Sequence, residues 1–249
     1  MEQKLVSIVT PMYQAKRYIR QTIESVQSQT YPDWEMIIVD DCSTDGCAEI
    51  VKQMAKKDAR IRYICQPNNM GVAQARNTAM EHARGRYLAF LDSDDLWTSE
   101  KLARQMELMQ RKNAAFVFAG CEVIDENGNR MHKIRQVPEK ITYEKLLWGN
   151  VIPCLTVLVD REKTGDFLMP RMGHEDYAAW LTIFKKIKTG YGINEVLGYY
   201  RVNRNSVSGR KLRTIRWTWN IYRKNQGLPV VKSFFYLLGH LTQAMGKMR

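Results

Sequence analysis

The sequence of 249 residues lacks long apolar runs, and its few cysteines have no regular spacing. No segment reaches the roughly 18 uninterrupted apolar residues of a membrane span, and the apolar stretch near the N-terminus is too short for a secretory signal. The five cysteines form no C-x-x-C pair and are odd in number, which argues against a disulfide framework or a zinc site. We therefore expect a cytoplasmic protein, either soluble or peripheral on the inner face of the cytoplasmic membrane.

Acidic residues are missing from the last part of the chain. Residues 196–249 contain eleven Lys and Arg and no Asp or Glu, which leaves 27 basic residues against all 26 acidic ones in residues 1–195. Nearly all of the net charge of +12 therefore lies in the tail. Such a charge suggests an anionic partner, either nucleic acid or a membrane surface. Trp217 and Trp219 alternate with arginines, but no recognised nucleic-acid-binding module is visible, so we expect no nucleic acid.

Two glycine-rich phosphate-binding motifs are also absent. The first predicted strand is not followed by G-x-G-x-x-G, and G-x-x-x-x-G-K-[ST] occurs nowhere, which argues against an NAD enzyme or a nucleotidyltransferase. With 45% hydrophobic residues the chain can bury a sizeable core, so one globular domain with an appendage is expected.

The first 112 residues alternate apolar runs with helical periodicity. Strands are predicted over 5–10, 35–40, 60–65 and 86–92, with helices over about 16–28, after 45, from 71, and over about 98–112. Because these strands are mostly apolar, they are expected to lie in a parallel sheet that is buried on both faces. The pattern predicts repeated β-α-β units.

Beyond residue 112 the pattern is mixed. Strands are predicted over 114–121, 152–160 and 192–202. A short helix is predicted over 141–150 and a longer one over 174–187. The Asn127-Gly128 pair predicts a hairpin turn. Two helical segments are expected after Lys211, separated by the breakers Gly227 and Pro229. We therefore divide the chain at residues 1–112, 113–210 and 211–249.

Carboxylates gather where two predicted strands end. Asp92, Asp94 and Asp95 follow one buried strand and Asp41 follows another. Ligands bind at the carboxyl ends of parallel strands, and clustered carboxylates repel one another unless a cation such as Mg²⁺ or Mn²⁺ neutralises them. An ionised Asp41 can also accept the N–H of a uracil ring. The alternative for both loops is simple capping of the helix that follows.

Five motifs, in order and at family spacing, carry a resemblance to a known family. They are T-P-x-Y at 10–13, V-D-D-x-S-x-D at 39–45, G-x-x-x-A-R-N at 71–77, L-D-S-D-D at 91–95 and E-D at 175–176. Together they resemble the inverting family-2 glycosyltransferases of the GT-A fold, from residue 5 to about residue 210. The sequence is also similar to bacterial cell-envelope transferases, those of teichuronic acid synthesis among them.

The resemblance implies a Rossmann-like, mostly parallel central sheet flanked by helices. Residues 1–112 would bind the nucleotide sugar, 113–210 would form a mixed α/β half for acceptor binding and catalysis, and 211–249 would form a basic amphipathic helical tail. The implied reaction moves a sugar from a nucleotide diphosphate donor, expected to be UDP-linked, to a cell-envelope polysaccharide or a lipid-linked oligosaccharide. The alternatives are an inactive scaffold with the same fold, or a basic protein that binds nucleic acid or membranes.

Site residues carry over from the motifs. The general base would be Asp176, the better match of the E-D pair that it forms with Glu175, because a sugar hydroxyl is a poor nucleophile until its proton is removed. The alternative is that the two acids only interact favourably with the helix dipole in the first turn of a helix and have no catalytic role. A divalent Mn²⁺ or Mg²⁺ would bind Asp94, with Asp95 in support. The predicted nucleotide-binding residues are Thr10, Pro11, Tyr13, Asp41, Arg76, Asp92 on the ribose side, and Ser93.

The remaining expectations concern basic residues. Arg201 and Arg204 would approach the diphosphate as part of a lid, although Asn203 stands where the family commonly has His; surface arginines of a basic tail are the alternative. Without its motif, Arg76 would be taken for a solvated cation on a helix face. In the tail, Trp219 and Tyr222 belong to an apolar stripe flanked by arginines, which predicts docking on an anionic membrane. Packing on the catalytic domain or on a second subunit is the alternative.

Overall fold

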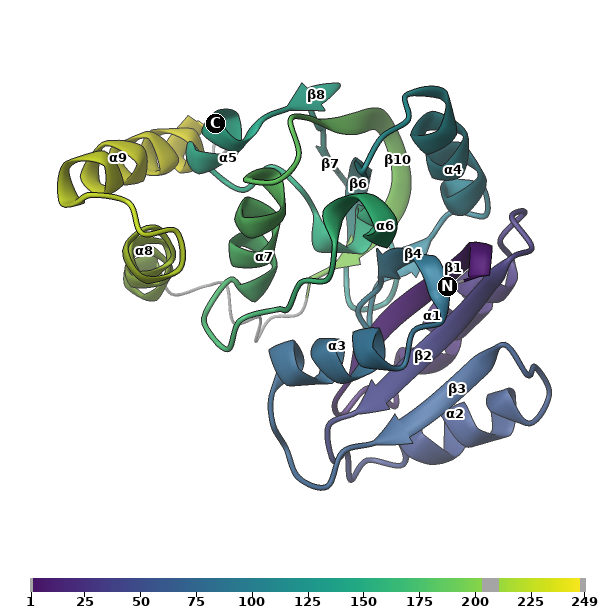
Figure 1. Cartoon of the computed structure of the whole chain (residues 1–249). Helices are drawn as coiled ribbons and strands as arrows, with labels where there is room; N and C mark the ends of the chain where they lie inside the picture. Colours follow the sequence, from purple (N-terminus) through teal and green to yellow (C-terminus); the bar gives the residue numbers. More distant parts are fainter. Residues whose placement is uncertain (1, 203–210, 247–249) are drawn as a thin grey trace.

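The computed structural model describes the backbone of residues 2–202 and 211–246, and the side chains of residues 4–202 and 213–240 (Figure 1). Asn203 and Arg204 lie outside the described residues, so the expectations placed on them stay predictions. The strands are β1 (Glu2–Met12), β2 (Trp34–Asp40), β3 (Ile61–Cys65), β4 (Gly85–Phe90), β5 (Leu96–Trp97), β6 (Phe116–Ile124), β7 (Arg130–Arg135), β8 (Lys140–Ile141), β9 (Leu158–Asp160) and β10 (Gly190–Arg201).

Helices cover both faces of one sheet. Side chains of α1, α2 and α4 belong to the core on one face, and those of α3, α5 and α7 to the core on the other. The helices are α1 (Ile19–Gln27), α2 (Cys47–Ala55), α3 (Val72–Glu81), α4 (Lys101–Arg111), α5 (Tyr143–Leu147), α6 (Arg161–Thr164), α7 (Glu175–Phe184), α8 (Lys211–Asn220) and α9 (Val230–Gly246), with a 3-10 turn η1 (Cys154–Thr156) and a π-helical turn η3 (Ile221–Asn225).

The sheet follows the order β3-β2-β1-β4-β9-β6-β10-β5, with β7 paired to β6 and β8 to β10. Strands β3, β2, β1 and β4 pair in parallel, as the repeated β-α-β pattern predicted, although the edge strand β3 is only partly buried. Every residue of β2 is buried. Because parallel strands point the same way, the carboxyl ends of β1, β2 and β4 meet at one edge of the sheet. The α/β fold class predicted from the sequence is confirmed.

The second half joins the same sheet through β9, which pairs antiparallel with both β4 and β6. The single strand predicted over 152–160 was wrong in its first part, where η1 precedes the short β9. The Thr156 N–H and hydroxyl both donate to the Pro153 carbonyl oxygen (3.0 and 2.9 Å), and these local bonds favour a turn. The hairpin predicted at Gly128 is confirmed, since β6 and β7 pair antiparallel across it.

Two helices, α8 and α9, follow in the tail, and Gly227 with φ +67° lies between them, as predicted. The turn η3 extends α8 before the break. Among the described residues, no helix combines the length and apolar character needed to cross a membrane.

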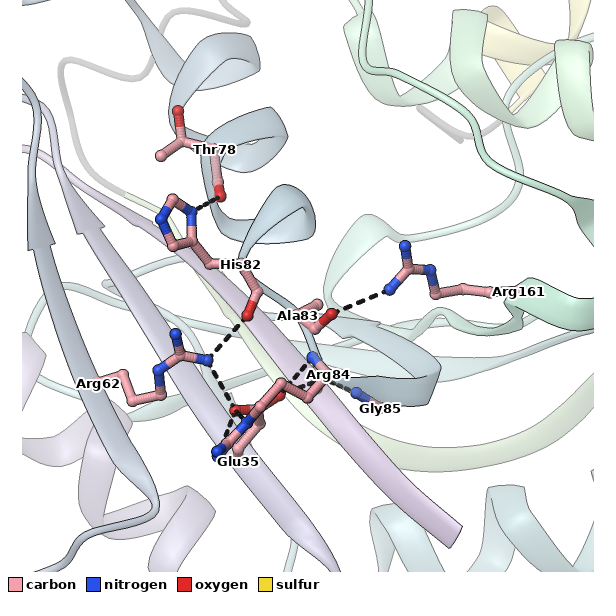
Figure 2. Close-up of polar contacts among 9 residues, drawn as sticks. Glu35, Arg62, Thr78, His82, Ala83, Arg84, Gly85 and Arg161 are labelled. Carbon is pink, nitrogen blue, oxygen red and sulfur yellow. Dashed lines mark hydrogen bonds and ion pairs between the residues drawn. The ribbon is translucent and has the colours of Figure 1, made fainter. Parts of the chain in front are cut away.

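An ionic cluster around the buried Glu35 closes the opposite, amino-terminal ends of the first strands (Figure 2). Glu35, 1% exposed on β2, accepts hydrogen bonds from the Ser7 hydroxyl (2.7 Å), the Arg84 N–H (2.8 Å) and the Arg62 guanidinium (3.0 Å). Arg62 also donates to the carbonyl oxygen of His82 at the end of α3 (2.8 Å). The cluster therefore ties β1, β2 and β3 to the turn between α3 and β4.

We expect Glu35→Gln to lower the free energy of unfolding by about 1–3 kcal/mol, because buried donors lose part of their charged acceptor. Burial opposes ionisation of Glu35, but hydrogen bonds from Arg84, Ser7 and Arg62 outweigh it and lower its pKa. Its stabilisation is therefore full above the unfolded-state pKa of about 4.3 and is lost as pH falls through the lower folded-state pKa. Urea unfolding at several pH values tests this, with exposed Glu24→Gln as control; equal midpoints for both variants would contradict it.

Candidate active site

The residues predicted to bind a nucleotide lie at the carboxyl edge of the parallel strands. Thr10 and Pro11 end β1, where Thr10 is fully buried, and Tyr13 follows with half of its surface exposed (53%). Asp92 and Ser93 begin the loop after β4. The hydroxyl of Thr22 in α1 donates to the Ser93 carbonyl oxygen (3.0 Å), which fixes this loop against the helix. The structure thus brings the first and fourth predicted motifs to one edge.

Asp41 is buried (4% exposed) directly after β2. Its carboxylate accepts the backbone N–H groups of Met70 (2.7 Å) and Gly71 (2.8 Å), and so it holds the loop that leads into α3. The preceding Asp40 is bonded to the Tyr63 hydroxyl (2.8 Å) on the neighbouring strand. A carboxylate has further lone pairs beyond these two bonds, so a base contact by Asp41 stays a prediction.

Arg76 joins the two acidic motifs of the site. It projects from α3, is 3% exposed, and donates to Asp92 (2.6 Å) and to Glu175 (2.5 Å). Burial disfavours its charge, but Asp92, Cys154, Glu175 and Asp176 outweigh this and raise its pKa. The interpretation of Arg76 as a solvated cation is therefore wrong. Its carboxylate partners come from the loop after β4 and from α7, which lie 16 and 99 residues away in the chain.

Arg201, predicted to meet the diphosphate, is 3% exposed at the end of β10. Its backbone N–H donates to the Asp95 carboxylate (2.8 Å), and its guanidinium donates to the main-chain oxygen of Asp94 (2.7 Å) and to Gln21 (3.1 Å). It is buried rather than part of a basic surface. Arg201 holds the Asp94–Asp95 turn in shape, and its contact with phosphate stays a prediction.

Asp94 and Asp95 are close carboxylates in very different surroundings. Asp95 is 1% exposed, and burial together with Asp94 and Asp92 raises its pKa well above the ordinary range. Asp94 is only partly buried, and burial followed by the charge of Asp92 raises its pKa to about 6. Arg201 bonds the backbone of Asp94 and not its carboxylate. The Asp94 side chain therefore carries a charge that a cation would stabilise.

This arrangement fits a metal ion whose coordination is completed by the phosphates of the substrate. In the described part of the chain, no three His, Cys, Asp or Glu side chains are grouped closely enough to hold a metal by themselves. Mg²⁺ commonly binds through one or two carboxylates and the phosphates of its substrate, with water in the other positions. Asp94 can supply such a carboxylate, whereas the Asp95 carboxylate already accepts a hydrogen bond from the Arg201 N–H. The donor set thus suits Mg²⁺ or Mn²⁺ bound together with a diphosphate.

Asp176 lies in the first turn of α7, partly buried beside Glu175. Burial and the charge of Glu175 raise its pKa to about 6, against the opposing effect of Arg76. Asn150, which sequence reasoning missed, directs its amide toward the Asp176 carboxylate at 3.4 Å. In the sequence, Asn150 is only a polar residue at the end of a predicted short helix, and nothing there indicates a role in the site. A carboxylate with this pKa is unprotonated near neutral pH and is basic enough to accept a proton.

Contacts with the tail hold α7 in place. Trp217 of α8 packs against Gly173, where an added Cβ would lie 2.0 Å from the indole, and meets the His174 ring edge-on at 5.2 Å. The Tyr177 and Tyr222 hydroxyls lie 3.2 Å apart in the core. Tyr222 is fully buried, so its predicted place on a membrane-facing stripe was wrong. The apolar side chains of this segment pack against the catalytic domain, around α7.

The family model described as "Glycosyl transferase family 2" matches residues 7–165. TuaG of Bacillus subtilis (strain 168), named for teichuronic acid biosynthesis, is 44% identical over 244 residues, which are 98% of this chain and 97% of TuaG. WfgD of Escherichia coli, named as a UDP-Glc:alpha-D-GlcNAc-diphosphoundecaprenol beta-1,3-glucosyltransferase, is 36% identical over 99% of this chain and 96% of WfgD. The crystal structure of S. aureus TarS with UDP-GlcNAc matches 97% of this chain and 72% of its own, with a TM-score of 0.76 and 19% identity.

Proposed function

Because the chain belongs to glycosyltransferase family 2, we propose that it transfers a sugar from a UDP-linked donor to a lipid-linked oligosaccharide or polysaccharide of the cell envelope. The family, the glycosyltransferase activity and the GT-A fold were all predicted from the sequence and are confirmed. The observation that carries the proposal is the buried Arg76, which brings Asp92 of the donor motif and Glu175 of the E-D pair to one place.

The proposed donor site is the edge formed by β1, β2, β4 and the start of α3. Tyr13 would line the base and ribose together with the backbone of Thr10 and Pro11, whose side chains are buried, and Asp41 would accept the uracil N–H. A UDP-linked donor is supported by the UDP-GlcNAc bound to TarS and by the UDP-glucose in the name of WfgD. The fold alone does not fix the sugar, because pocket shape decides it.

The proposed chemistry is a single displacement with inversion at the anomeric carbon. Asp176 removes the proton of the acceptor hydroxyl as the hydroxyl attacks. Retention by double displacement would need a second carboxylate as nucleophile, and both Asp92 and Glu175 are bonded to Arg76. Mn²⁺ or Mg²⁺ held by Asp94 would neutralise charge on the diphosphate as it leaves.

The proposed acceptor is a sugar on a lipid diphosphate. WfgD, similar over nearly its whole length, carries GlcNAc-diphosphoundecaprenol in its name, and TuaG is named for an envelope polymer. Such an acceptor is anchored in a bilayer by its lipid. The enzyme must then work at the membrane surface, where a peripheral position fits the absence of a membrane-spanning helix among the described residues.

A transfer assay tests the proposal. Purified protein would be incubated with UDP-glucose, UDP-GlcNAc or GDP-mannose, a GlcNAc-diphospholipid acceptor, and either Mn²⁺ or EDTA. We expect release of UDP from one of the UDP-sugars in the presence of metal, and a product whose new linkage is β when the donor is α. Transfer from GDP-mannose alone would overturn the donor assignment, and a retained anomeric configuration would overturn the single displacement.

A further inference from the structure

The first half of α9 presents an apolar face to the outside. Its outward-facing residues recur at intervals of one, three and four positions, which places them on one side of the helix. All are about half exposed or more: Val230 (57%), Val231 (79%), Phe234 (56%), Phe235 (57%) and Leu238 (48%). We call these five residues the α9 stripe. A contiguous exposed group of this kind marks an interaction surface.

The orientation of α9 is fixed by its opposite side. Ser233 on that side is fully buried. Trp148 of the body packs edge-on against Tyr236 (5.5 Å) and against Phe235 of the stripe (5.0 Å), which stays 57% exposed. Trp148 also lies so close to Gly239 that an added Cβ would be 2.0 Å from its ring. Rotating α9 to bury the stripe would break these contacts. The stripe therefore faces outward as a consequence of how the helix is packed.

The segment that carries the α9 stripe has charges of a single sign. Lys232 is exposed within the same turns of α9, and Arg216 and Lys224 are exposed on α8 and η3. Residues 196–249 contain no Asp or Glu. In a two-fold dimer the same patch contacts itself, so a second copy would bring this positive charge against its own kind. An anionic surface complements both the charge and the apolar residues.

We propose that the α9 stripe docks on an anionic phospholipid surface, with its aromatic and aliphatic side chains in the headgroup region and the basic residues of the tail on lipid phosphates. The choice of a bilayer as partner rests on the lipid-linked acceptor proposed above. Several basic residues near an anionic surface together give reversible binding, and the apolar stripe adds a part that salt does not screen.

Docking would also orient the catalytic half. Tyr222 bonds the main-chain oxygen of Leu147 and meets Tyr177 of α7, and Trp217 packs on Gly173 just before that helix. In Figure 1, α8 and α9 lie beside α7 and α5, at the end of the molecule away from β3 and α2. The packed side chains of α8 and η3 thus connect the docking helix with the helix that carries Asp176.

Sedimentation with vesicles tests the proposal on the full-length protein. We expect it to pellet with vesicles that contain phosphatidylglycerol and not with pure phosphatidylcholine. Val231→Glu with Phe234→Glu, both at exposed positions, should abolish pelleting, whereas Met131→Glu with Ile134→Glu, equally exposed on β7, should leave it unchanged. Replacing Arg216, Lys224 and Lys232 by Gln should weaken binding about 100-fold, at roughly fivefold per charge. Gln at the exposed Lys56, Lys57 and Lys112 of the body is the matched control.

Three outcomes would overturn the docking. The first is pelleting that does not depend on lipid charge, and the second is pelleting by the Val231→Glu, Phe234→Glu variant. The third is a dimer in sedimentation velocity that this change dissociates, since the stripe would then bind a second copy. Turnover of UDP-sugar on a water-soluble acceptor separates this inference from the proposed function. Pelleting without turnover supports docking and contradicts the enzyme's assignment, whereas turnover without pelleting contradicts docking alone.

Discussion

Asp94→Ala is expected to lower sugar transfer by about 10³-fold or more, because a metal that stabilises leaving-group charge contributes several kcal/mol. The protein should stay folded, with a Tm equal to or above that of the wild type. Burial and Asp92 raise the pKa of Asp94 to about 6, which means that its ionised form is unfavourable in the folded protein without a cation. Initial rates of UDP release over a Mn²⁺ titration measure the effect.

Asp33→Ala serves as the control for Asp94→Ala, since Asp33 is an exposed aspartate at the amino end of β2, opposite the carboxyl edge of the sheet. UDP should raise the Tm of the wild type more strongly with Mn²⁺ than without it, because ligands that bind only the folded state stabilise it. In Asp94→Ala this dependence on metal should disappear. Near wild-type transfer by Asp94→Ala in metal-limited buffer would show that Asp94 is not the metal ligand.

Asp176→Asn is expected to lose roughly two to four orders of magnitude in kcat while it binds the donor as the wild type does, since general-base catalysis contributes about that much. Asn has nearly the same shape but cannot accept the proton of the acceptor hydroxyl. Single-turnover rates and the Kd for UDP measure chemistry and binding separately. Parallel losses in donor affinity and in rate would assign Asp176 a structural role.

The pH profile gives a second measure of Asp176. A general base acts in its unprotonated form, so kcat/KM should fall as pH decreases through about 6, the raised pKa of this carboxyl. Because the charge of Glu175 contributes to that raised pKa, Glu175→Gln should move the acidic limb to lower pH. Loss of the Glu175 carboxylate also leaves Arg76 with more uncompensated charge, which acts in the same direction. An unmoved limb would show that another group titrates.

Sequence patterns predicted the parts of the fold that local residues determine. The strand predicted over 35–40 is β2 (Trp34–Asp40), and that over 192–202 is β10 (Gly190–Arg201), because continuous or alternating apolar residues suit a buried strand wherever it lies. The two-residue β5 was not predicted. It exists because Leu96 and Trp97 pair with β10, about a hundred residues away, and its own sequence carries no strand signal.

The candidate site was predicted as a set of residues but not as a set of contacts. The motifs named Arg76 and Arg201 as neighbours of nucleotide or phosphate, and both proved to be buried. Arg76 meets Glu175 because α3 and α7 pack on the same face of the sheet. Arg201 meets Asp94 and Asp95 because β10 ends beside their turn. Tertiary packing decides such partners, and the sequence of one helix or strand does not contain it.

The insertion of β9 between β4 and β6 limits how this enzyme can be re-engineered. A chimaera that joins the first 112 residues of one relative to the remainder of another would cut a continuous sheet, because β9 hydrogen-bonds to strands on both sides of the junction. It would also separate Arg76 from the carboxylate that it holds on α7. The donor-binding and acceptor-binding halves therefore cannot be exchanged independently between relatives. A recombined enzyme must inherit β4, β9 and the Arg76–Glu175 pair from the same parent.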